Sequence, residues 1–319
     1  MGEFELIERF FKRTARHADV GIGDDCAIWT PTPGQQLAFS ADMLVEGRHF
    51  LSTVNPRDLG HKSLAVNLSD LAACGATPRA FLLSLSLPRV DEGWLSGFSD
   101  GLFELADAHG CELIGGDTTQ GPLNVSITVM GEVPTHQAIL RSGAQAGDDL
   151  YVSGHLGDAR LALEGFRGTV SLPQSVFDLA RARMERPEPR TALGVSLRGV
   201  ANAMADISDG LLGDLGHVLK ASRVGADIHL SAIQNLMLTR EAWSCPQDLM
   251  HRCVLSGGDD YELVFTCSPK QRHQVLSLSQ ACGIPVTRIG RITPEPRLKL
   301  LTEDGGVLPN TFASFDHFA

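Results

Sequence analysis

The chain has 319 residues, of which 43% are hydrophobic and 20% are charged, and its formal net charge is −11. This length is enough for two domains, and the composition is that of an ordinary globular protein. The acidic balance argues against a general nucleic-acid surface, and no run of about 18 apolar residues suggests a membrane span. The seven cysteines are odd in number and lack C-x-x-C spacing, which argues against disulfides and zinc. With no signal-peptide pattern, we expect a cytoplasmic protein.

The first domain is expected to begin with an amphipathic helix over residues 3–16, where four apolar residues recur at helical spacing. A glycine-flanked pair, Asp24 and Asp25, follows in a segment typical either of a solvated turn or of a loop near a ligand. Residues 37–41 predict a short strand that ends at Asp42.

Residues 55–75 predict the helix around which the first domain is organised. Asn55 is expected to be its N-cap, Pro56 its first helical residue, and Gly75 its end. An apolar stripe on this helix is expected to be buried: Leu64, Ala65, Leu68, Leu71 and Ala72. Asp70 lies beside the stripe. A carboxylate is costly to bury unless a cation meets it, so Asp70 is either a surface residue or a functional one.

Further strands over residues 80–87, 111–114 and 123–129, with a helix over 91–109, predict an α+β domain with a largely antiparallel sheet. Glycine-rich and polar composition after residue 143 places the boundary there, with domains of residues 1–143 and 144–319. The second domain is expected to be α/β, because strands alternate with helices. Its expected strands are 149–154, 203–207, 227–230, 261–267, 286–292 and 297–301.

Carboxylates recur at strand ends and in glycine loops, at Asp24-Asp25, Asp42, Asp70, Gly116-Asp117-Thr118 and Asp206-Ile207-Ser208-Asp209-Gly210. Each alone is most simply a turn. Gathered in the fold, they would form an oxygen cage suited to Mg²⁺, and the glycines would admit phosphate oxygens. This is the apparatus of phosphoryl transfer, although the chain has neither a P-loop nor a protein-kinase catalytic loop.

These motifs, together with Ser40-Ala41-Asp42, His49-Phe50 and Ser256-Gly257-Gly258-Asp259-Asp260-Tyr261-Glu262, resemble the thiamine-monophosphate kinase family. The resemblance runs in order from about Gly2 to Phe318. The family shares an ATP-binding superfamily with aminoimidazole-ribonucleotide synthetase, selenophosphate synthetase and a hydrogenase-maturation protein. The resemblance implies two domains, a homodimer formed through the N-terminal sheet, and active sites near the domain and subunit boundaries.

The resemblance also implies roles for individual residues. The implied magnesium ligands are Asp25, Ser40, Ala41 through its backbone, Asp42, Asp70, Asp117, Asp206 and Asp209. The implied ATP contacts are Gly116, Asp117, Arg141 and Ser208, and the implied substrate contacts are His49, Asp259 and Phe315. Catalysis is expected to depend most on Asp42, Asp70, Asp209 and Arg141. Ala41 stands where the family commonly has Thr, and Asp259 replaces a usual Glu.

The implied activity is direct transfer of the ATP γ-phosphoryl group to thiamine monophosphate, assisted by several Mg²⁺ ions, with no membrane or nucleic-acid partner. One alternative is another ATP-activating enzyme of the superfamily. Selenophosphate synthetases use an N-terminal Cys or Sec and the hydrogenase-maturation relatives end in Cys, whereas the first cysteine here is Cys26 and the chain ends in Ala319. A second alternative is a non-catalytic nucleotide or metal sensor. Nothing basic beside Cys26 in sequence marks it as a nucleophile.

Overall fold

The computed structural model describes residues 2–312, and these form two compact units. Unit 1 comprises the residues up to Leu71 together with Ala76–His136, and unit 2 comprises Ala72–Gly75 and the chain from Gln137 onward. The composition predicts a boundary after residue 143, whereas unit 2 takes up the chain from Gln137. Residues 137–143 group with unit 2 because their backbone is hydrogen-bonded there, as in the bond from the Met204 N–H to the Leu140 carbonyl (3.0 Å).

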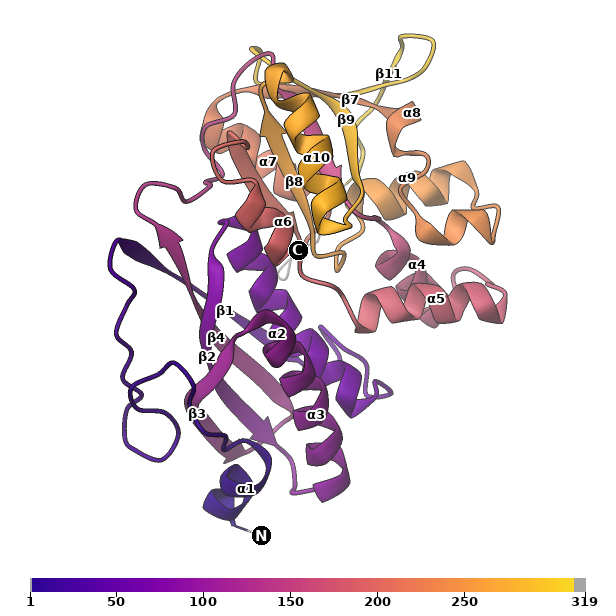
Figure 1. The fold of residues 1–319 in the computed structure, drawn as a ribbon. Coiled ribbons are helices and arrows are strands. Elements are labelled where there is room, and N and C mark those ends of the chain that lie inside the picture. Colours follow the sequence, from indigo (N-terminus) through magenta and orange to yellow (C-terminus); the bar gives the residue numbers. More distant parts are fainter. Residues whose placement is uncertain (1, 313–319) are drawn as a thin grey trace. The chain divides into compact units, whose positions relative to one another are not determined.

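Unit 1 is a four-stranded sheet with two long helices on one face (Figure 1). Its elements are α1 (Glu3–Phe10), β1 (Gln35–Val45), α2 (Pro56–Ala73), β2 (Thr77–Leu87), α3 (Glu92–His109), β3 (Glu112–Gln120) and β4 (Asn124–Pro134). The strand order is β1-β4-β2-β3, and only the β2–β3 pair is parallel. The expected largely antiparallel sheet is therefore confirmed.

The ends of α2 follow from local sequence. The Asn55 side chain accepts a hydrogen bond from the Arg57 N–H (2.9 Å), as an N-cap does. Gly75 has a φ of 66°, and the Ala76 N–H returns to the Leu71 carbonyl (2.8 Å), which ends the helix. The apolar stripe of α2 is buried as expected. Gly101 of α3 allows the two helices to approach, because a Cβ there would lie 1.8 Å from the Arg57 carbonyl oxygen.

The two faces of this sheet differ in their surroundings. The inner face, covered by α2 and α3, carries buried apolar side chains from β2 and β4, namely Phe81, Leu83, Leu85, Val125, Ile127 and Val129. The outer face carries exposed apolar side chains, of which Phe39 is 64% exposed and Met43 is 53% exposed. Because neighbouring strand partners point to the same face, the pairing register assigns every strand residue to one face or the other.

Three expectations for unit 1 were wrong in extent. Helix α1 ends at Phe10 rather than near residue 16, because the Glu112 carboxylate accepts the backbone N–H groups of Arg16 (2.7 Å), His17 (3.0 Å) and Ala18 (2.6 Å). Strand β1 continues past Asp42, since it pairs with β4 throughout. Strand β3 continues through the Gly-Gly-Asp motif, since it pairs with β2. Asp42 and Asp117 therefore lie within strands.

Unit 2 is built on a seven-stranded sheet, and its helices alternate with strands as expected for α/β. Its elements are β5 (Asp149–Ser153), α4 (Asp158–Phe166), α5 (Gln174–Glu185), α6 (Thr191–Ser196), β6 (Ala203–Ile207), α7 (Leu211–Ser222), β7 (Gly225–His229), α8 (Leu230–Ile233), η1 (Leu238–Glu241), α9 (Gln247–Ser256), β8 (Glu262–Cys267), η2 (Pro269–Gln271), α10 (Arg272–Cys282), β9 (Val286–Thr293), β10 (Leu298–Leu301) and β11 (Val307–Leu308). The order is β11-β10-β7-β9-β5-β8-β6, and most neighbours are antiparallel. No helix among the described residues is long and apolar enough to cross a membrane.

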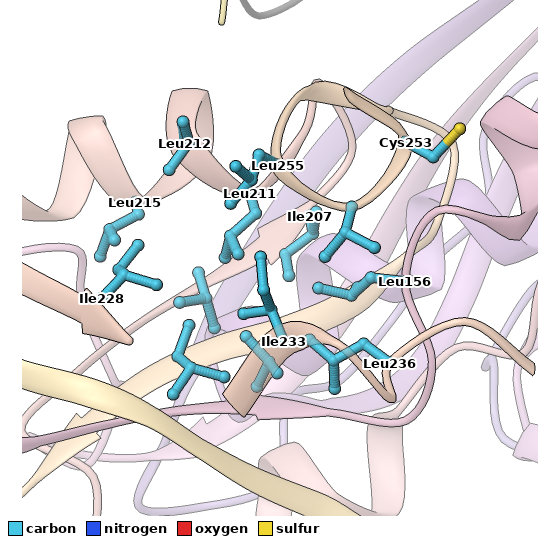
Figure 2. Close-up of a cluster of buried hydrophobic side chains, with 14 of the residues drawn as sticks. Leu156, Ile207, Leu211, Leu212, Leu215, Ile228, Ile233, Leu236, Cys253 and Leu255 are labelled. Atoms are coloured by element: carbon cyan, nitrogen blue, oxygen red, sulfur yellow. The ribbon is translucent and has the colours of Figure 1, made fainter. Parts of the chain in front are cut away.

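The main core of unit 2 gathers around the point where β6 ends and α7 begins. Ile207 and Leu211 are both 0% exposed, and Figure 2 shows them among Leu215, Ile228 and Leu255. Burying each such side chain contributes about 1.5–3 kcal/mol. The Ser208–Gly210 segment between Ile207 and Leu211 is therefore fixed at both ends by the core.

Candidate functional site

Two of the acidic site residues of unit 1, Asp42 and Asp70, lie where β1 faces α2. Ser40 and Asp42 are two residues apart on β1, so both point to the inner face. The Ser40 Oγ donates a hydrogen bond to the Asp70 carboxylate, and the Asp42 N–H donates to Asn67 Oδ1 (3.1 Å). Asn67 and Asp70 are three residues apart and share one side of α2. The structure thus places three implied magnesium ligands, Ser40, Asp42 and Asp70, at one contact between strand and helix.

Asn67 was not among the expected site residues. It is 1% exposed, and its Nδ2 donates to the Ser63 carbonyl (3.0 Å), which leaves Oδ1 facing the Asp42 N–H. This amide therefore fixes β1 against α2 beside Asp42. A buried asparagine three residues before Asp70 on the same helix was the available signal.

Asp117 lies on the other face of the same sheet. Asp117 of β3 is the register partner of Ser84 of β2, and Ser84 is the partner of Ser126 of β4. Ser126 is in turn the partner of Met43 of β1, which belongs to the outer face, so all four side chains share that face. Asp42 belongs to the inner face, and its strand β1 lies at the opposite edge of the sheet from β3. Three strand spacings correspond to about 14 Å. One copy of unit 1 therefore does not bring Asp42 and Asp117 together.

Gly116 lies beside Asp117 at a position that requires glycine. Its φ is 145°, and a Cβ there would lie 1.8 Å from the Leu83 carbonyl oxygen. The β3 backbone can follow its path along β2 only without a side chain at this residue. Gly116 is exposed, so its backbone is open to solvent at the edge of the sheet.

Asp25 is exposed on the loop between α1 and β1, and its N–H donates to the Asp24 carboxylate (2.8 Å). A bridge between Val20 and Ile28 closes the loop. Its end is held by Glu132, which accepts the Thr32 N–H (2.8 Å) and hydroxyl (2.7 Å). Burial alone would raise the pKa of Glu132, but the Thr32 donors and the Arg79 guanidinium bring that pKa below its ordinary value.

His49 and Ala41 flank the β1 cluster. The His49 Nδ1 accepts the Val45 N–H (3.0 Å), so the proton of a neutral ring lies on Nε2. Ala41, between Ser40 and Asp42, is exposed and points to the outer face, paired with Thr128. A metal contact at this residue is limited to its backbone.

In unit 2 the expected residues lie on two adjoining loops. Asp206 is 4% exposed near the end of β6, and Ser208 and Asp209 follow in the β6–α7 loop. The Asp259 N–H donates to the Ser208 carbonyl (2.8 Å), so the segment before β8 runs beside this loop. Asp259 itself has a φ of 71°, which is unusual for a residue other than glycine.

Arg141 lies elsewhere in unit 2. Its carbonyl accepts a hydrogen bond from the Ser222 hydroxyl (3.2 Å) at the last residue of α7, and its side chain is exposed. The 12 residues of α7 span about 18 Å, and the Ser208–Asp209 loop lies at the other end of that helix. The backbone of Arg141 is thus separated from Ser208.

A buried ionic network forms around Glu262, the first residue of β8, and was not predicted. Glu262 is 0% exposed and accepts hydrogen bonds from Arg190 Nε (2.6 Å), Arg183 Nη2 (3.0 Å) and the Ser153 hydroxyl (2.6 Å). Burial lowers the pKa of Arg190, but the Glu262 carboxylate outweighs it and the pKa is raised. This pairing rigidifies the start of β8, which follows the Asp259-Asp260-Tyr261 segment.

Asp260 is also buried, and both of its carboxylate oxygens accept the Gly157 N–H (2.9 and 3.1 Å). Burial raises its pKa well above the ordinary value.

Phe315, the remaining expected substrate contact, lies outside the described residues. Within residues 2–312, no three or more His, Cys, Asp or Glu side chains are placed to hold a metal ion.

The two units match two halves of one known architecture. Residues 23–133 match AIR synthase related protein, N-terminal domain, and residues 145–303 match AIR synthase related protein, C-terminal domain. The chain is therefore a member of the AIR synthase related proteins.

Relatives that match over nearly the full length show which family of AIR synthase related proteins the chain belongs to. The chain is 43% identical over 323 residues to thiamine-monophosphate kinase of Escherichia coli (strain K12), covering 100% of this chain and 98% of the relative. It is 42% identical to the solved thiamine-monophosphate kinase from Stenotrophomonas maltophilia K279a, with a TM-score of 0.85 and 96% of each chain covered. AaThiL complexed with AMPPCP and TMP is 28% identical, with a TM-score of 0.76, covering 91% of this chain and 89% of that one. The chain belongs to the thiamine-monophosphate kinase family, as its motifs implied.

Proposed function

We propose that this chain transfers the γ-phosphoryl group of ATP to the phosphate of thiamine monophosphate and releases thiamine diphosphate and ADP. The observation that carries the proposal is the 43% identity over the full length of a thiamine-monophosphate kinase. The relative complexed with AMPPCP and TMP supports both substrates, since AMPPCP is an ATP analogue. We place the reaction in the cytoplasm, because all seven cysteines lie within residues 2–312 and are free rather than paired in disulfides.

Magnesium fits the donor set of the described residues. Ser40, Asp42 and Asp70 offer hard oxygen donors in unit 1, and Asp206 and Asp209 offer them in unit 2. Mg²⁺ is commonly held by one or two carboxylates, with phosphate oxygens and waters completing its shell. Small groups of ligands, rather than a closed protein cage, suit that mode of binding. When bound, the ions supply charge neutralisation for the triphosphate and for the phosphate acceptor.

The remaining ligands and contacts are assigned by family resemblance. Asp25, Asp117 and the backbone of Ala41 complete the proposed metal ligands, and Gly116, Ser208 and Arg141 contact the nucleotide. His49 and Asp259 contact thiamine monophosphate, and Asp259 retains the charge of the usual Glu with a shorter side chain. The acceptor is already anionic, so it needs orientation and charge neutralisation more than a strong base. No covalent enzyme intermediate is required.

A second copy of the chain is the proposed partner of the outer face of unit 1. The exposed apolar side chains Phe39, Met43, Val45 and Leu82 share this face by register. Contiguous exposed apolar side chains on a sheet are typical of an interface. We expect Phe39→Asp combined with Met43→Asp to convert a dimer to a monomer in sedimentation experiments. Leu276→Asp, at an equally exposed leucine of α10, is the matched control and should leave the dimer intact.

The position of Asp117 gives the same partner a role in catalysis. Asp42 and Asp117 are too far apart in one chain to share an ion whose oxygen ligands lie about 2.1 Å away. If both bind one Mg²⁺, Asp117 must come from a second copy. This arrangement makes the dimer the active species, and dilution below its dissociation constant should abolish turnover.

The decisive experiment incubates the protein with ATP, Mg²⁺ and a panel of phosphorylated acceptors, and measures thiamine diphosphate by chromatography. Formation of thiamine diphosphate only with thiamine monophosphate supports the proposal. Turnover with another acceptor would favour a different ATP-activating enzyme of the superfamily, and ATP binding without any product would favour a sensor.

A titration with free Mg²⁺ tests whether several ions are needed for turnover. The proposed aspartates and ATP bring many negative charges together, and two unit charges about 4 Å apart interact by about 4 kcal/mol at an effective dielectric near 20. One ion bound to ATP cannot offset several such repulsions. With MgATP held constant, turnover should keep rising with free Mg²⁺, whereas saturation at one Mg²⁺ per ATP would contradict the shared site.

A further inference from the structure

Asp214 occupies a nest of backbone N–H groups at the start of α7. It lies in the first turn of this helix, is 4% exposed, and was not among the expected site residues. Its Oδ2 accepts the N–H groups of Ser208 (3.1 Å), Asp209 (3.0 Å) and Gly210 (3.1 Å). Successive N–H groups that converge on one point form an anion-binding concavity. Here the chain's own carboxylate fills it, so one side chain holds three consecutive N–H groups of the Ser208–Gly210 backbone.

Backbone hydrogen bonds connect the Ser208–Gly210 segment and the residue before it to the Asp259 segment. The Ser208 carbonyl accepts the Asp259 N–H (2.8 Å), and the Ile207 carbonyl accepts the Tyr261 N–H (2.9 Å). There is no free space between the two loops, because a Cβ on Gly258 would lie 2.4 Å from the Ser208 carbonyl oxygen. A shift of the first loop must therefore move the second.

The second loop carries backbone strain that depends on this support. Asp259 and Tyr261 have φ values of 71° and 52°, in the left-handed region that side chains other than glycine disfavour. Such conformations persist only when surrounding contacts hold them. The contacts that hold them include the hydrogen bonds to Ser208 and Ile207, and the buried Glu262 pairing fixes the next residue of the chain.

We propose that Asp214 is a positioning residue: it sets the backbone of Ser208 and Asp209 and, through the Ser208 carbonyl, the placement of Asp259. The inference rests on the proposed function, which assigns these three residues to nucleotide, magnesium and substrate. The proposed function assigns Asp214 itself no contact with nucleotide, magnesium or substrate. A purely structural role, as a cap of α7, is the competing explanation.

The two explanations differ in what Asp214→Ala changes. As a positioning residue, Asp214 supports all three proposed contacts, so its loss should raise the half-saturating Mg²⁺ concentration and the KM for thiamine monophosphate about tenfold each. As a cap alone, its loss should lower the unfolding midpoint and leave both constants unchanged. Asp214→Asn keeps an oxygen acceptor for the nest, so partial rescue is expected relative to Asp214→Ala. Asp214→Glu keeps the charge but displaces it by one methylene, and should fail to rescue.

The matched control is Asp148→Ala. Asp148 is also 4% exposed and accepts a backbone N–H, from Gln145 (2.9 Å), and the Asn202 amide (3.0 and 2.9 Å). It precedes β5, at the end of the sheet opposite the Ser208 loop, because β5 and β6 both run antiparallel to β8. Asp148→Ala should lower the unfolding midpoint with unchanged kinetic constants.

The experiment measures steady-state kinetics, thermal unfolding and calorimetric binding of AMPPCP with Mg²⁺ for the wild type and each variant. Weaker nucleotide binding by Asp214→Ala, partial recovery in Asp214→Asn, and normal constants in Asp148→Ala are the expected results. If Asp214→Ala does not fold, the kinetic constants and AMPPCP binding of Asp214→Asn are compared with those of Asp214→Glu. Values nearer the wild type in Asp214→Asn support the positioning role. Kinetic constants and AMPPCP binding unchanged in every folded Asp214 variant would overturn the inference. Absence of thiamine diphosphate from the wild type would instead overturn the proposed function, and AMPPCP binding would still test Asp214.

Discussion

The two units hold their acidic residues in different ways. In unit 1 all of the proposed site residues except Asp25 and His49 lie within regular elements: Ser40, Ala41 and Asp42 on β1, Asp70 on α2, and Gly116 and Asp117 on β3. In unit 2, Ser208, Asp209 and Asp259 lie on loops, and Asp206 lies near the end of β6. A strand residue is placed by the hydrogen-bond ladder of its sheet, whereas a loop residue needs dedicated partners. Asp214 supplies such partners to Ser208 and Asp209, and the buried Glu262 pairing fixes the start of β8, which follows the Asp259 segment in the chain.

This difference predicts where folding and activity are separable. In unit 1 a site carboxylate can lose its charge while the backbone hydrogen bonds of its strand or helix keep the residue in position. In unit 2 the buried residues that hold the loops also contribute to stability, so a substitution among them changes both properties.

The largest effect is expected for Glu262→Gln. Two arginines, Arg183 and Arg190, would lose their buried anionic partner, and breaking such a pair costs about 3–5 kcal/mol. Urea unfolding measures the change. Glu188→Gln is the control, since Glu188 also pairs with Arg190 but its side chain is 69% exposed, and it should cost less than about 1 kcal/mol. Equal losses in the two variants would show that burial does not govern this network.

Asp70→Asn should lower kcat about 100-fold, or about 2.7 kcal/mol, with little change in the unfolding midpoint. The asparagine oxygen can still accept the Ser40 hydroxyl, and the buried stripe of α2 is untouched. Steady-state kinetics and thermal unfolding together measure the split. Near-normal turnover would show that Asp70 is not a site residue. A large loss of stability would contradict the expectation that activity and folding are separable in unit 1.

Acid should weaken unit 1 through Glu132. Its pKa in the folded state is lowered, so its stabilisation is complete above the unfolded-state pKa of about 4.3 and is lost as pH falls through the folded-state pKa. The difference in unfolding free energy between wild type and Glu132→Gln should therefore be largest near pH 7 and shrink below pH about 4. A difference that stays constant with pH would mean that the carboxylate charge contributes nothing.

The smallest effect is expected for Cys26→Ser. Cys26 is exposed in the loop beside Asp25, and a surface substitution changes stability by about 0.5 kcal/mol or less. Turnover should stay near the wild-type value. A large loss would revive a nucleophilic role, which labelling of acid-precipitated protein with γ-labelled ATP would then detect.

Local signals explain which parts of the fold were predictable. The ends of α2 were correct because Asn55, Pro56 and Gly75 act on their own neighbours. Helix α1 was overextended because Glu112, some hundred residues away in sequence, captures the N–H groups of residues 16–18. The lengths of β1 and β3 depend on partner strands that no local pattern specifies.

Residue types alone led to a prediction of the site's chemistry, but they did not give its geometry. Acidic residues in glycine motifs indicated magnesium and phosphate. The assignment of Asp42 and Asp117 to opposite faces follows from the strand order β1-β4-β2-β3, which is a property of the whole domain. Asp214 and Glu262 were missed because a buried carboxylate is identified only by its partners, and Arg190 lies 72 residues before Glu262.

The opposite placement of Asp42 and Asp117 has a genetic consequence. If the proposed dimer shares its sites, two defective alleles, one encoding Asp42→Asn and the other Asp117→Asn, should complement each other when expressed together. In a mixed dimer with shared sites, one site collects both substitutions and the other receives none. Random pairing makes half of the dimers mixed, so about a quarter of the wild-type activity should return. If each chain carried a whole site of its own, every site in the mixture would stay defective and no activity would be restored.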